Sequence, residues 1–187
     1  MSTRIAVGIT GSSGSVYALD FLKRCPHDKF LIVSKWGKAV VKDELRMADP
    51  MAELTPLAKA VFADSDLTAP LASGTNPIDA FVILPASTST IGKIASGIGD
   101  TLITRTAAVC LKERRKVILC VRETPLSTVT LRQLAELSAM GVIVMPISPP
   151  LYFVPKTVNE YVQGFVNKVL HHVGVDVGGG WRSEELE

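Results

Sequence analysis

Five short apolar runs along the chain constrain the fold most strongly. They are residues 5–9, 30–33, 80–84, 117–121 and 142–145. Runs of this length, rich in valine, isoleucine and leucine, are typical of buried strands. Segments with the apolar spacing of a helix lie between and after them, at 15–24, 36–45, 49–60, 91–97, 102–114, 131–140 and 157–172. Alternating strands and helices predict a doubly wound α/β fold of the Rossmann or flavodoxin type, with a mostly parallel sheet flanked by helices.

The totals describe one ordinary globular domain. The chain has 187 residues, of which 47% are hydrophobic and 20% charged, enough for a sizeable core. We expect a single domain over 1–175 and a polar tail over 176–187, either mobile or docked on a neighbouring subunit. The net charge of +2 gives no electrostatic reason to expect nucleic acid or a membrane surface as partner. We find no bilayer-spanning run and no signal peptide, which predicts a cytoplasmic protein.

The cysteines give no reason to expect a metal. Cys25, Cys110 and Cys120 are widely separated, and no C-x-x-C pair or Cys/His cluster accompanies them. The sequence therefore predicts no metal site. Cys110 and Cys120 lie in apolar segments, which favours buried thiols over catalytic ones.

A turn rich in glycine and hydroxyl groups follows the first apolar run. The stretch Gly8-Ile9-Thr10-Gly11-Ser12-Ser13-Gly14 leads into a helical segment. A strand, such a turn and a helix form a cradle for phosphate, because glycines let the backbone approach and the helix start presents amide N–H groups. The pattern is not G-x-G-x-x-G and lacks the lysine of a P-loop, so the class of phosphate ligand stays open.

Polar side chains follow four of the predicted strands where each strand ends. They are Thr10 to Ser13, Ser34, Ser87 to Thr90, and Arg122 with Glu123. Because the carboxyl ends of parallel strands share one edge of a sheet, we expect these groups to line one crevice. Such a crevice suits a ligand with a phosphate and a polar heterocycle. A long loop over 64–79, rich in Pro, Gly, Ser and Thr, is a further candidate for function.

Six short motifs occur in order along the chain. They are Thr10-Gly11-Ser12-Ser13-Gly14, Ser34-Lys35, Pro85-Ala86-Ser87, LKERRK at 111–116, RETPLS at 122–127, and Leu151-Tyr152-x-x-Pro155. Together they resemble the UbiX-type flavin prenyltransferases, a family that includes small subunits encoded beside aromatic-acid decarboxylases. The matches extend from about residue 4 to about residue 175, and the block from Lys112 to Ser127 is the most specific.

The resemblance implies both a fold and a reaction. It implies a flavodoxin-like fold that binds FMN, in homo-oligomers that are usually dodecamers built from trimers. It implies that a dimethylallyl group is joined to N5 and C6 of reduced FMN, with dimethylallyl monophosphate as donor, phosphate as leaving group and no metal. The prenylated FMN would then serve a UbiD-type decarboxylase.

The same resemblance implies roles for particular residues. Positions matched to FMN contacts are Gly11, Ser12, Ser13, Ser34, Ser87, Thr88, Ser89, Thr90 and Arg122. Positions matched to the reaction centre are Ser13, Glu44, Lys112, Arg122 and Glu123. Positions matched to the prenyl phosphate are Tyr152, Lys168 and Lys112. Two departures stand out, because Lys168 replaces the usual arginine and Ala108 the usual aspartate.

These residue types also suit the chemistry by themselves. The departure of phosphate from an allylic carbon leaves negative charge on oxygen, which cations such as Lys112 and Arg122 stabilise. Glu123 or Glu44 can move a proton at the phosphate or the flavin. The aromatic face of Trp36 can shelter positive charge on the allyl group.

Two other functions stay open on the sequence. The chain can be an accessory subunit that binds FMN for an aromatic-acid decarboxylase without prenylating it. It can also be an oxidative decarboxylase of peptidyl cysteine, a class of the same fold superfamily that uses an early histidine. The early histidine here is His27, whose neighbours do not match that motif, so we favour the prenyltransferase.

Overall fold

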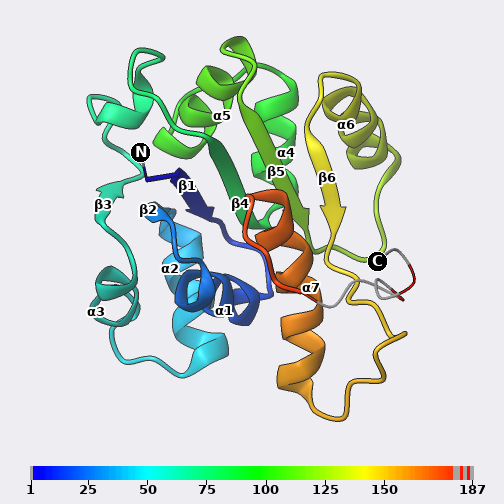
Figure 1. The fold of residues 1–187 in the computed structure, drawn as a ribbon. Helices are drawn as coiled ribbons and strands as arrows, with labels where there is room; N and C mark the ends of the chain where they lie inside the picture. The colour runs from blue at the N-terminus through cyan, green and yellow to red at the C-terminus, as the bar shows by residue number, and fades with distance from the viewer. Residues whose placement is uncertain (1, 179–181, 183–184, 186–187) are drawn as a thin grey trace.

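The computed structural model describes residues 2–178, 182 and 185, and its centre is one parallel sheet (Figure 1). Within these residues the sheet has six strands in the order β3-β2-β1-β4-β5-β6, and every neighbouring pair is parallel. The strands are β1 Arg4–Ile9, β2 Asp28–Val33, β3 Ala60–Ala63, β4 Ala80–Ala86, β5 Lys116–Val121 and β6 Ile143–Pro146. The predicted doubly wound α/β class is confirmed.

Helices cover both faces of the sheet. They are α1 Ser15–Arg24, α2 Lys35–Leu45, α3 Pro50–Leu54, α4 Thr88–Ala95, α5 Leu102–Lys112, α6 Thr128–Ala139 and α7 Val158–His172, with short 3-10 turns at Thr55–Leu57 and Pro70–Ala72. One hydrophobic cluster joins the sheet to α1, α2, α3 and α7, and a second joins it to α4, α5 and α6. The domain therefore has the three layers expected of helices on either side of a parallel sheet.

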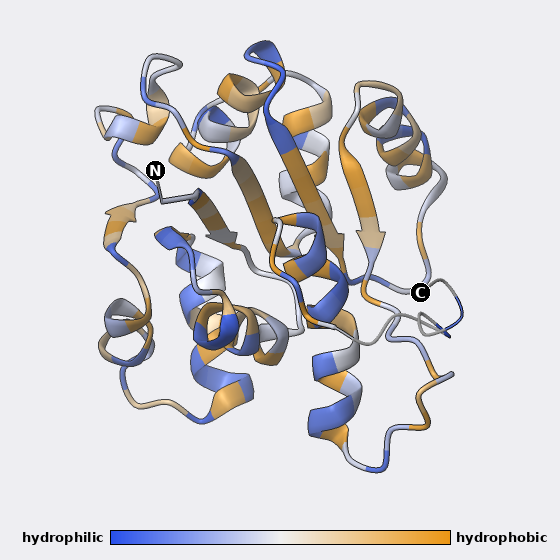
Figure 2. Cartoon of the chain, viewed as in Figure 1, coloured by the Kyte–Doolittle hydropathy of each residue, from blue (hydrophilic) through white to orange (hydrophobic). Residues whose placement is uncertain are grey.

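Strand residues alternate between the two clusters. In β4, Val82 and Leu84 belong to the first cluster, and Phe81 and Ile83 belong to the second. Every residue of β4 is buried, which explains why the sequence shows a continuous apolar run there and no alternation with polar residues. Burial of each large apolar side chain contributes roughly 1.5–3 kcal/mol. Figure 2 shows the hydrophobic colour along the strands, and both hydrophobic and hydrophilic colours along the helices.

The segment from 49 to 63 differs from the expected helix over 49–60. The helix α3 ends at Leu54, a 3-10 turn follows, and Ala60–Ala63 forms β3 at the edge of the sheet. The strand state of β3 depends on pairing with β2, where Phe30 faces Ala60. Such pairing is a tertiary effect, which local apolar spacing does not report.

Two predicted helices begin earlier than expected, at their serine caps. The Ser87 hydroxyl accepts a hydrogen bond from the amide of Thr90, so residues 88–90 form the first turn of α4. Ser127 caps α6 in the same way. Gly141, with φ of 92°, follows the end of α6 as predicted.

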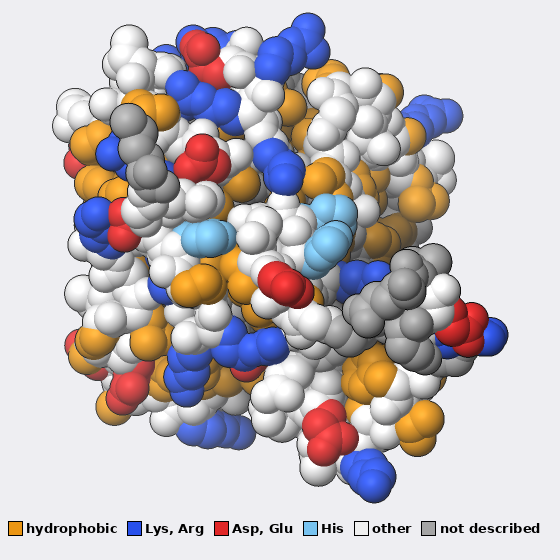
Figure 3. Space-filling view, in the orientation of Figure 1, with side chains coloured by type: hydrophobic (Ala, Val, Ile, Leu, Met, Phe, Trp, Pro, Cys, Tyr) orange, Lys and Arg blue, Asp and Glu red, His pale blue; other side chains and the backbone are white. Residues whose placement is uncertain are grey.

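The surface carries mixed charge, in keeping with the small net charge. On the face shown in Figure 3, Lys and Arg side chains are interspersed with Asp and Glu. None of the helices in the described part of the chain has the length and apolar character needed to cross a membrane. The predicted tail over 176–187 falls largely outside the described residues and stays a prediction.

The strand order reverses direction between β1 and β4. The chain passes from β1 outward to β2 and β3, and then returns to β4 on the other side of β1. In open parallel sheets, ligands bind outside the carboxyl ends of the strands at such a switch point. The fold therefore predicts a ligand site at the loops that follow β1 and β4.

Candidate active site

A cleft of about 330 Å³ lies at this switch point. Its lining comes from Thr10, Gly11, Ser34, Lys35, Trp36, Asp64, Ser87, Ser89, Thr90, Lys93, Thr101, Ile103 and Thr104. The residues after β1, β2 and β4 thus meet in one crevice, as predicted from the sequence. The prediction was wrong for the fourth strand end, because Arg122 and Glu123, which follow β5, do not line this cleft. Asp64, Lys93 and the Thr101–Thr104 pair are members that the sequence reasoning did not identify.

Thr10 ties the ends of β1 and β4 together at the floor of the cleft. Its buried hydroxyl donates to the carbonyl of Pro85 at 2.7 Å and accepts from the amide of Ser87 at 2.7 Å. The proton and one acceptor site of this hydroxyl are used inside the protein, so it sets the position of the loop after β4. The sequence predicts that Thr10 offers its hydroxyl to the ligand; in the structure this hydroxyl joins the ends of β1 and β4 instead.

Three helices begin at the cleft. Ser34 caps α2 by accepting from the amide of Gly37 at 2.9 Å, and Ser87 caps α4 at the amide of Thr90. Thr101 caps α5 in a reciprocal arrangement with Thr104. Each N-terminus carries partial positive charge from the helix dipole, and unpaired first-turn amides bind anions readily. The amides of Thr88 and Ser89 precede the capped one, which makes the start of α4 a suitable place for a phosphate.

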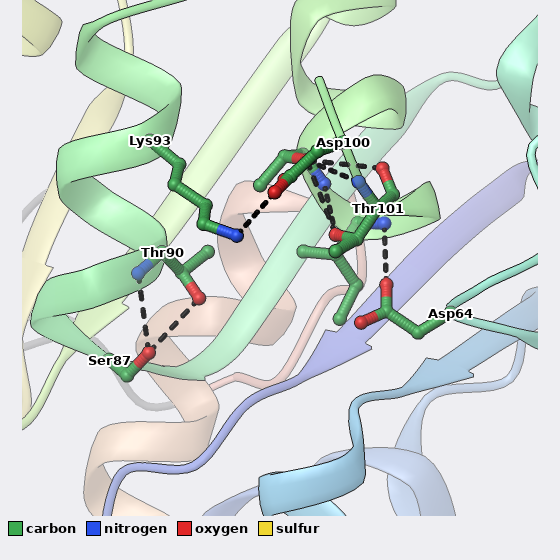
Figure 4. A network of polar contacts seen from close by, with 8 residues as sticks. Asp64, Ser87, Thr90, Lys93, Asp100 and Thr101 are labelled. Carbon is green, nitrogen blue, oxygen red and sulfur yellow. Dashed lines mark hydrogen bonds and ion pairs between the residues drawn. The ribbon is translucent and has the colours of Figure 1, made fainter. Parts of the chain in front are cut away.

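The charged groups of the cleft form a network with α5 (Figure 4). The Asp64 carboxylate accepts from the amide of Ile103 at 2.9 Å, so it occupies the N-terminus of α5. The Lys93 ammonium lies 2.7 Å from the Asp100 carboxylate. Because the Asp64 carboxylate already occupies the N-terminus of α5, an anion that enters the cleft can bind at the N-termini of α2 and α4. Lys93 follows Ser89 by one helical turn, a spacing that could have revealed it from the sequence.

A second hollow, of about 470 Å³, adjoins the glycine turn that follows β1. It is lined by Ser13, Gly14, Val16, Tyr17, Glu44, Leu45, Arg122, Ile147, Pro149 and Tyr161. The hollow collects three of the predicted reaction-centre residues, Ser13, Glu44 and Arg122. Tyr17 and Tyr161 are additional members that the sequence reasoning did not identify.

Glu44 caps the start of α1 from α2. Its carboxylate accepts from the amide of Gly14 at 3.0 Å and from the amide of Ser15 at 2.7 Å. Gly14 has a φ of 113°, which favours glycine, and offers α1 no side-chain cap of its own. Burial alone would raise the pKa of Glu44, but hydrogen bonds from Ser13, Ser15 and Gly14 outweigh it and lower that pKa. Glu44 is therefore an acceptor near neutral pH.

Arg122 connects the end of β5 to the same turn. The Ser12 hydroxyl donates to the carbonyl of Arg122 at 2.7 Å, and Arg122 Nε lies 3.4 Å from the carbonyl of Ser13. The structure thus brings together Ser12, Ser13 and Arg122 as predicted. Glu123 is exposed, and its carboxylate accepts from the amide of Thr124 at 2.9 Å. Its side chain lines neither the cleft nor the hollow.

Lys112 lies away from both. Its helix α5 begins at the cleft and runs for 11 residues, so Lys112 is roughly 15 Å away along the axis. There Lys112 pairs with Glu113 and lines a separate hollow of about 510 Å³ that also includes Arg105 and residues 73–75. Within one chain, Lys112 does not join the other predicted reaction-centre residues.

Tyr152 lies in the loop before α7, and Lys168 lies on α7 itself. Tyr152 is in the loop after β6 and is 45% exposed. The neighbouring Phe153 packs onto Gly164 of α7, and Lys168 follows Gly164 by one turn on the same face. The predicted pairing of Tyr152 with Lys168 is thus compatible with the course of the loop.

His27 lies outside the cleft. Its Nε2 is 3.2 Å from the carbonyl of Val173, at the end of α7. This histidine is therefore not placed for chemistry at the switch point. Within the described residues, no group of three or more His, Cys, Asp or Glu side chains is arranged to hold a metal ion.

Comparison with known proteins narrows the assignment. The flavoprotein family profile matches residues 1–169. The flavin prenyltransferase UbiX of Thermoplasma acidophilum is 47% identical over 174 residues, covering 92% of this chain and 95% of that protein. AnUbiX (PadA1), solved in complex with FMN and dimethylallyl pyrophosphate, has a TM-score of 0.90 at 32% identity and covers 97% of this chain and 100% of its own. A dodecameric FMN-dependent UbiX-like decarboxylase of Escherichia coli O157:H7 has a TM-score of 0.90 at 32% identity, covering 96% and 100%.

A parallel sheet with a cleft at its switch point agrees with a flavodoxin-like fold, and the family profile assigns the chain to the flavoproteins. Sequence similarity assigns the chain to a smaller group than the fold does, because relatives matched over nearly their whole length are all named flavin prenyltransferases. The chain belongs to the flavin prenyltransferase family. The predicted family, fold class and transferase class are confirmed, and the match to the flavoprotein family agrees with the predicted FMN cofactor.

Proposed function

We propose that this protein transfers a dimethylallyl group from dimethylallyl monophosphate to N5 and C6 of reduced FMN, releasing phosphate. One observation carries the proposal: an anion-binding cleft and a hollow with Glu44 and Arg122 adjoin across a single glycine turn. A flavin held in the cleft can present its ring to a donor held in the hollow. The flavin supplies the nucleophilic nitrogen and carbon, and the protein supplies position and charge.

The cleft suits FMN in its charge and in its shape. Ser34 and Ser87 begin two helices whose N-termini attract the phosphate, and Lys35 adds positive charge. Trp36 is 68% exposed at the same cleft, so its ring can stack on an aromatic heterocycle. We infer that Gly11 to Ser13 and Ser87 to Thr90 hold FMN, and that Arg122 lies between FMN and donor.

The hollow suits a prenyl phosphate. Arg122 is half-buried there, and its guanidinium can bond two phosphate oxygens as negative charge develops on the leaving group. Glu44 stays ionised and holds the turn that carries Ser13, whose hydroxyl can orient a proton near the flavin. Tyr152 and Lys168 supply further contacts to the prenyl donor. Glu123 can approach the donor if its side chain rotates away from the amide of Thr124.

We infer that Lys112 acts on the site of a neighbouring subunit. Its place at the far end of α5 prevents it from reaching Arg122 of its own chain. In a homo-oligomer, the hollow that contains Lys112 and Arg105 can face the cleft of another copy. The relative from Escherichia coli is dodecameric, and an assembly of that kind would bring several copies of the chain into contact.

The product and the compartment complete the proposal. Prenylated FMN would serve a UbiD-type decarboxylase as its cofactor. Cys25, Cys110 and Cys120 are free thiols. Such a state suits the reducing cytoplasm, which is where we place the protein.

The decisive experiment is anaerobic incubation of the protein with reduced FMN and a prenyl donor, followed by mass spectrometry of the released cofactor. Dimethylallyl monophosphate and diphosphate are tested in parallel, since the relative AnUbiX was solved with the diphosphate. We expect FMN to gain one dimethylallyl unit with the monophosphate. Unmodified FMN with both donors would contradict the proposal.

An accessory FMN-binding subunit is the second candidate. The observation in its favour is that Glu123 and Lys112 both lie outside the cleft and the hollow of their own chain. In the same experiment this function predicts saturable FMN binding with no mass gain. The absence of FMN binding by folded protein would overturn both functions.

A further inference from the structure

The turn after β6 holds a residue in an unusual backbone conformation. The amide of Val154 donates to the carbonyl of Leu151 at 2.9 Å, which closes the turn. Val154 has a φ of 52°, in the left-handed region that β-branched residues rarely adopt. Its side chain is 74% exposed, so burial of Val154 does not maintain this conformation. Some other contact of the turn must therefore hold it.

The turn contacts α7 through Phe153, whose side chain is 40% exposed and rests on Gly164. The Phe153 ring lies so close to Gly164 that a methyl group there would come within 2.6 Å of Phe153 Cε1 and closer still to Cζ. A side chain at position 164 and the ring cannot occupy this space together. Gly164 therefore forms a notch in the middle of a helix, where glycine is otherwise unfavourable. The next residue, Phe165, is buried against the ring of Tyr17, and this packing fixes α7 against α1.

The seated ring also contacts Tyr152. The rings of Tyr152 and Phe153 are 5.9 Å apart at an interplanar angle of 87°, an edge-to-face pair. The position of Tyr152 is therefore restricted by the closed turn, by the contact of Phe153 with Gly164 and by this aromatic pair. Lys168, one turn beyond Gly164, lies further along the same face of α7.

We propose that Phe153 and Gly164 are positioning residues for the prenyl donor. Phe153, seated in the Gly164 notch, fixes the turn and thereby places Tyr152 beside Lys168. This inference rests on the proposed function, in which Tyr152 contacts the donor phosphate. It assigns Gly164 a role in donor recognition through Phe153, with no contact of its own to the donor.

The test is a double-substitution cycle with Gly164→Ala and Phe153→Ala in the full chain. The equilibrium dissociation constant of dimethylallyl monophosphate is measured by calorimetry with oxidised FMN bound, so no turnover is needed. We expect each single substitution to weaken donor binding about tenfold or more, since small displacements of positioned groups have large effects. The FMN dissociation constant should stay within about twofold. In the Phe153→Ala background, Gly164→Ala should add nothing, because the ring that it displaces is gone.

Gly92→Ala is the matched control. Gly92 lies within α4, and a methyl group there would approach only the Gln133 side chain, at 3.4 Å. Both glycine substitutions raise helix propensity, so neither is expected to lower the melting temperature through the helix itself. Donor binding should be weakened by Gly164→Ala and not by Gly92→Ala.

Hydrogen exchange by mass spectrometry tests the contact between Phe153 and Gly164 independently of any donor. Exchange of the peptide spanning 151–157 should speed up in Gly164→Ala, because the closing hydrogen bond of Val154 is lost. Unchanged exchange, or losses of affinity that add fully in the double variant, would overturn the role of this contact. Tyr152→Ala distinguishes a failure of the proposed function from a failure of the Phe153–Gly164 contact. If Tyr152→Ala leaves donor binding unchanged, Tyr152 does not bind the donor. If Gly164→Ala still accelerates exchange, the contact between Phe153 and Gly164 nevertheless holds the turn.

Discussion

At the scale of single residues, Glu44 caps the N-terminus of a helix to which it does not belong. The carboxylate comes from α2 and receives the amides of Gly14 and Ser15 at the start of α1. An anion at a helix N-terminus is favoured by the dipole as well as by the hydrogen bonds. One side chain thus holds the turn between the cleft and the hollow, and its charge state matters for both.

Replacement of Glu44 by Gln should change how stability depends on pH. The folded-state pKa of Glu44 is lowered, so its contribution is present above about pH 4.3, the ordinary glutamate value, and is lost as pH falls through the folded pKa. At pH 7 we expect a loss of about 1 kcal/mol, as for other helix caps, and a fall in Tm of roughly 2–4 °C. The gap between the two proteins in thermal unfolding should close toward pH 3.

The control for this prediction is Asp43→Asn, an exposed neighbour on the same helix. It removes the same charge without touching Gly14 or Ser15. A gap between wild type and Glu44→Gln that stays constant from pH 7 to pH 3 would show that the ionised carboxylate is not what stabilises the turn.

Lys168 is the second residue whose chemistry can be measured. A lysine gives one point charge where an arginine gives two aligned hydrogen bonds. Charge-assisted bonds contribute roughly 1.5–3 kcal/mol, and about 1.4 kcal/mol is tenfold in affinity. Lys168→Arg should therefore tighten dimethylallyl monophosphate about tenfold, and Lys168→Ala should weaken it by more. Steady-state kinetics would show this in KM for the donor, with FMN affinity unchanged.

Lys23→Ala is the matched change for Lys168→Ala, because Lys23 is an exposed helical lysine on α1. It should leave the KM for the donor as it is in wild type. Equal KM values in wild type and Lys168→Ala would reduce Lys168 to a cation on the surface of α7.

At the scale of elements, the cleft depends on how two strand ends are joined. The Thr10 hydroxyl holds both the carbonyl at the end of β4 and the amide that begins the α4 cap. It therefore sets the distance between the glycine turn and the start of α4. Both of these elements line the cleft in which we propose that FMN binds, so their spacing would determine how its phosphate is bound.

Thr10→Val keeps the shape of the side chain and removes the hydroxyl. The amide of Ser87 would lose its partner, and the carbonyl of Pro85 would keep only its bond from the backbone amide of Thr10, at 3.3 Å. The cost is roughly 1–3 kcal/mol, and Tm should fall by roughly 2–4 °C for each kcal/mol. FMN affinity, measured by fluorescence titration, should fall together with Tm. Thr106→Val serves for comparison, because that buried hydroxyl makes only a 3.4 Å contact with the carbonyl of Leu71. Equal effects of the two changes would contradict a special role for Thr10.

At the scale of the whole molecule, one chain does not assemble all the residues assigned to the reaction. Lys112 and Arg105 occupy a hollow at the end of α5 that is remote from the cleft. A site shared between subunits resolves this separation, because the far edge of one sheet can meet the cleft of another copy. Light scattering at micromolar concentration should accordingly show a large homo-oligomer.

Mixed oligomers test a shared site directly. Lys112→Ala and Arg122→Ala are each expected to be inactive, and co-expression should restore roughly a quarter of wild-type turnover if each site takes the two residues from different chains. Glu44→Gln co-expressed with Arg122→Ala should restore nothing beyond the parents, since both residues line the same hollow of one chain. No restoration with Lys112→Ala would contradict a site shared between subunits, and full activity of Lys112→Ala by itself would place Lys112 outside the reaction.

The alternation of strands and helices was determined by the sequence itself. Buried parallel strands need continuous apolar runs, and their polar ends must then share one edge of the sheet. For this reason the residue pattern alone assigns Ser34, Ser87 and Arg122 to loops that meet at that edge. The caps Ser87 and Thr157 are equally local, because a cap bonds an amide only three residues away.

Only the tertiary structure decided which side chains meet across elements. Glu44 reaches Gly14 across 30 residues, and Phe153 meets Gly164 because a loop folds back on a helix. The strand β3 exists through its pairing with β2, and the length of α5 removes Lys112 from the cleft. Such contacts depend on the relative placement of packed elements, which is set by the whole core at once. The local residue pattern predicts the type of each helix or strand and where it ends, but it does not predict the distances between elements.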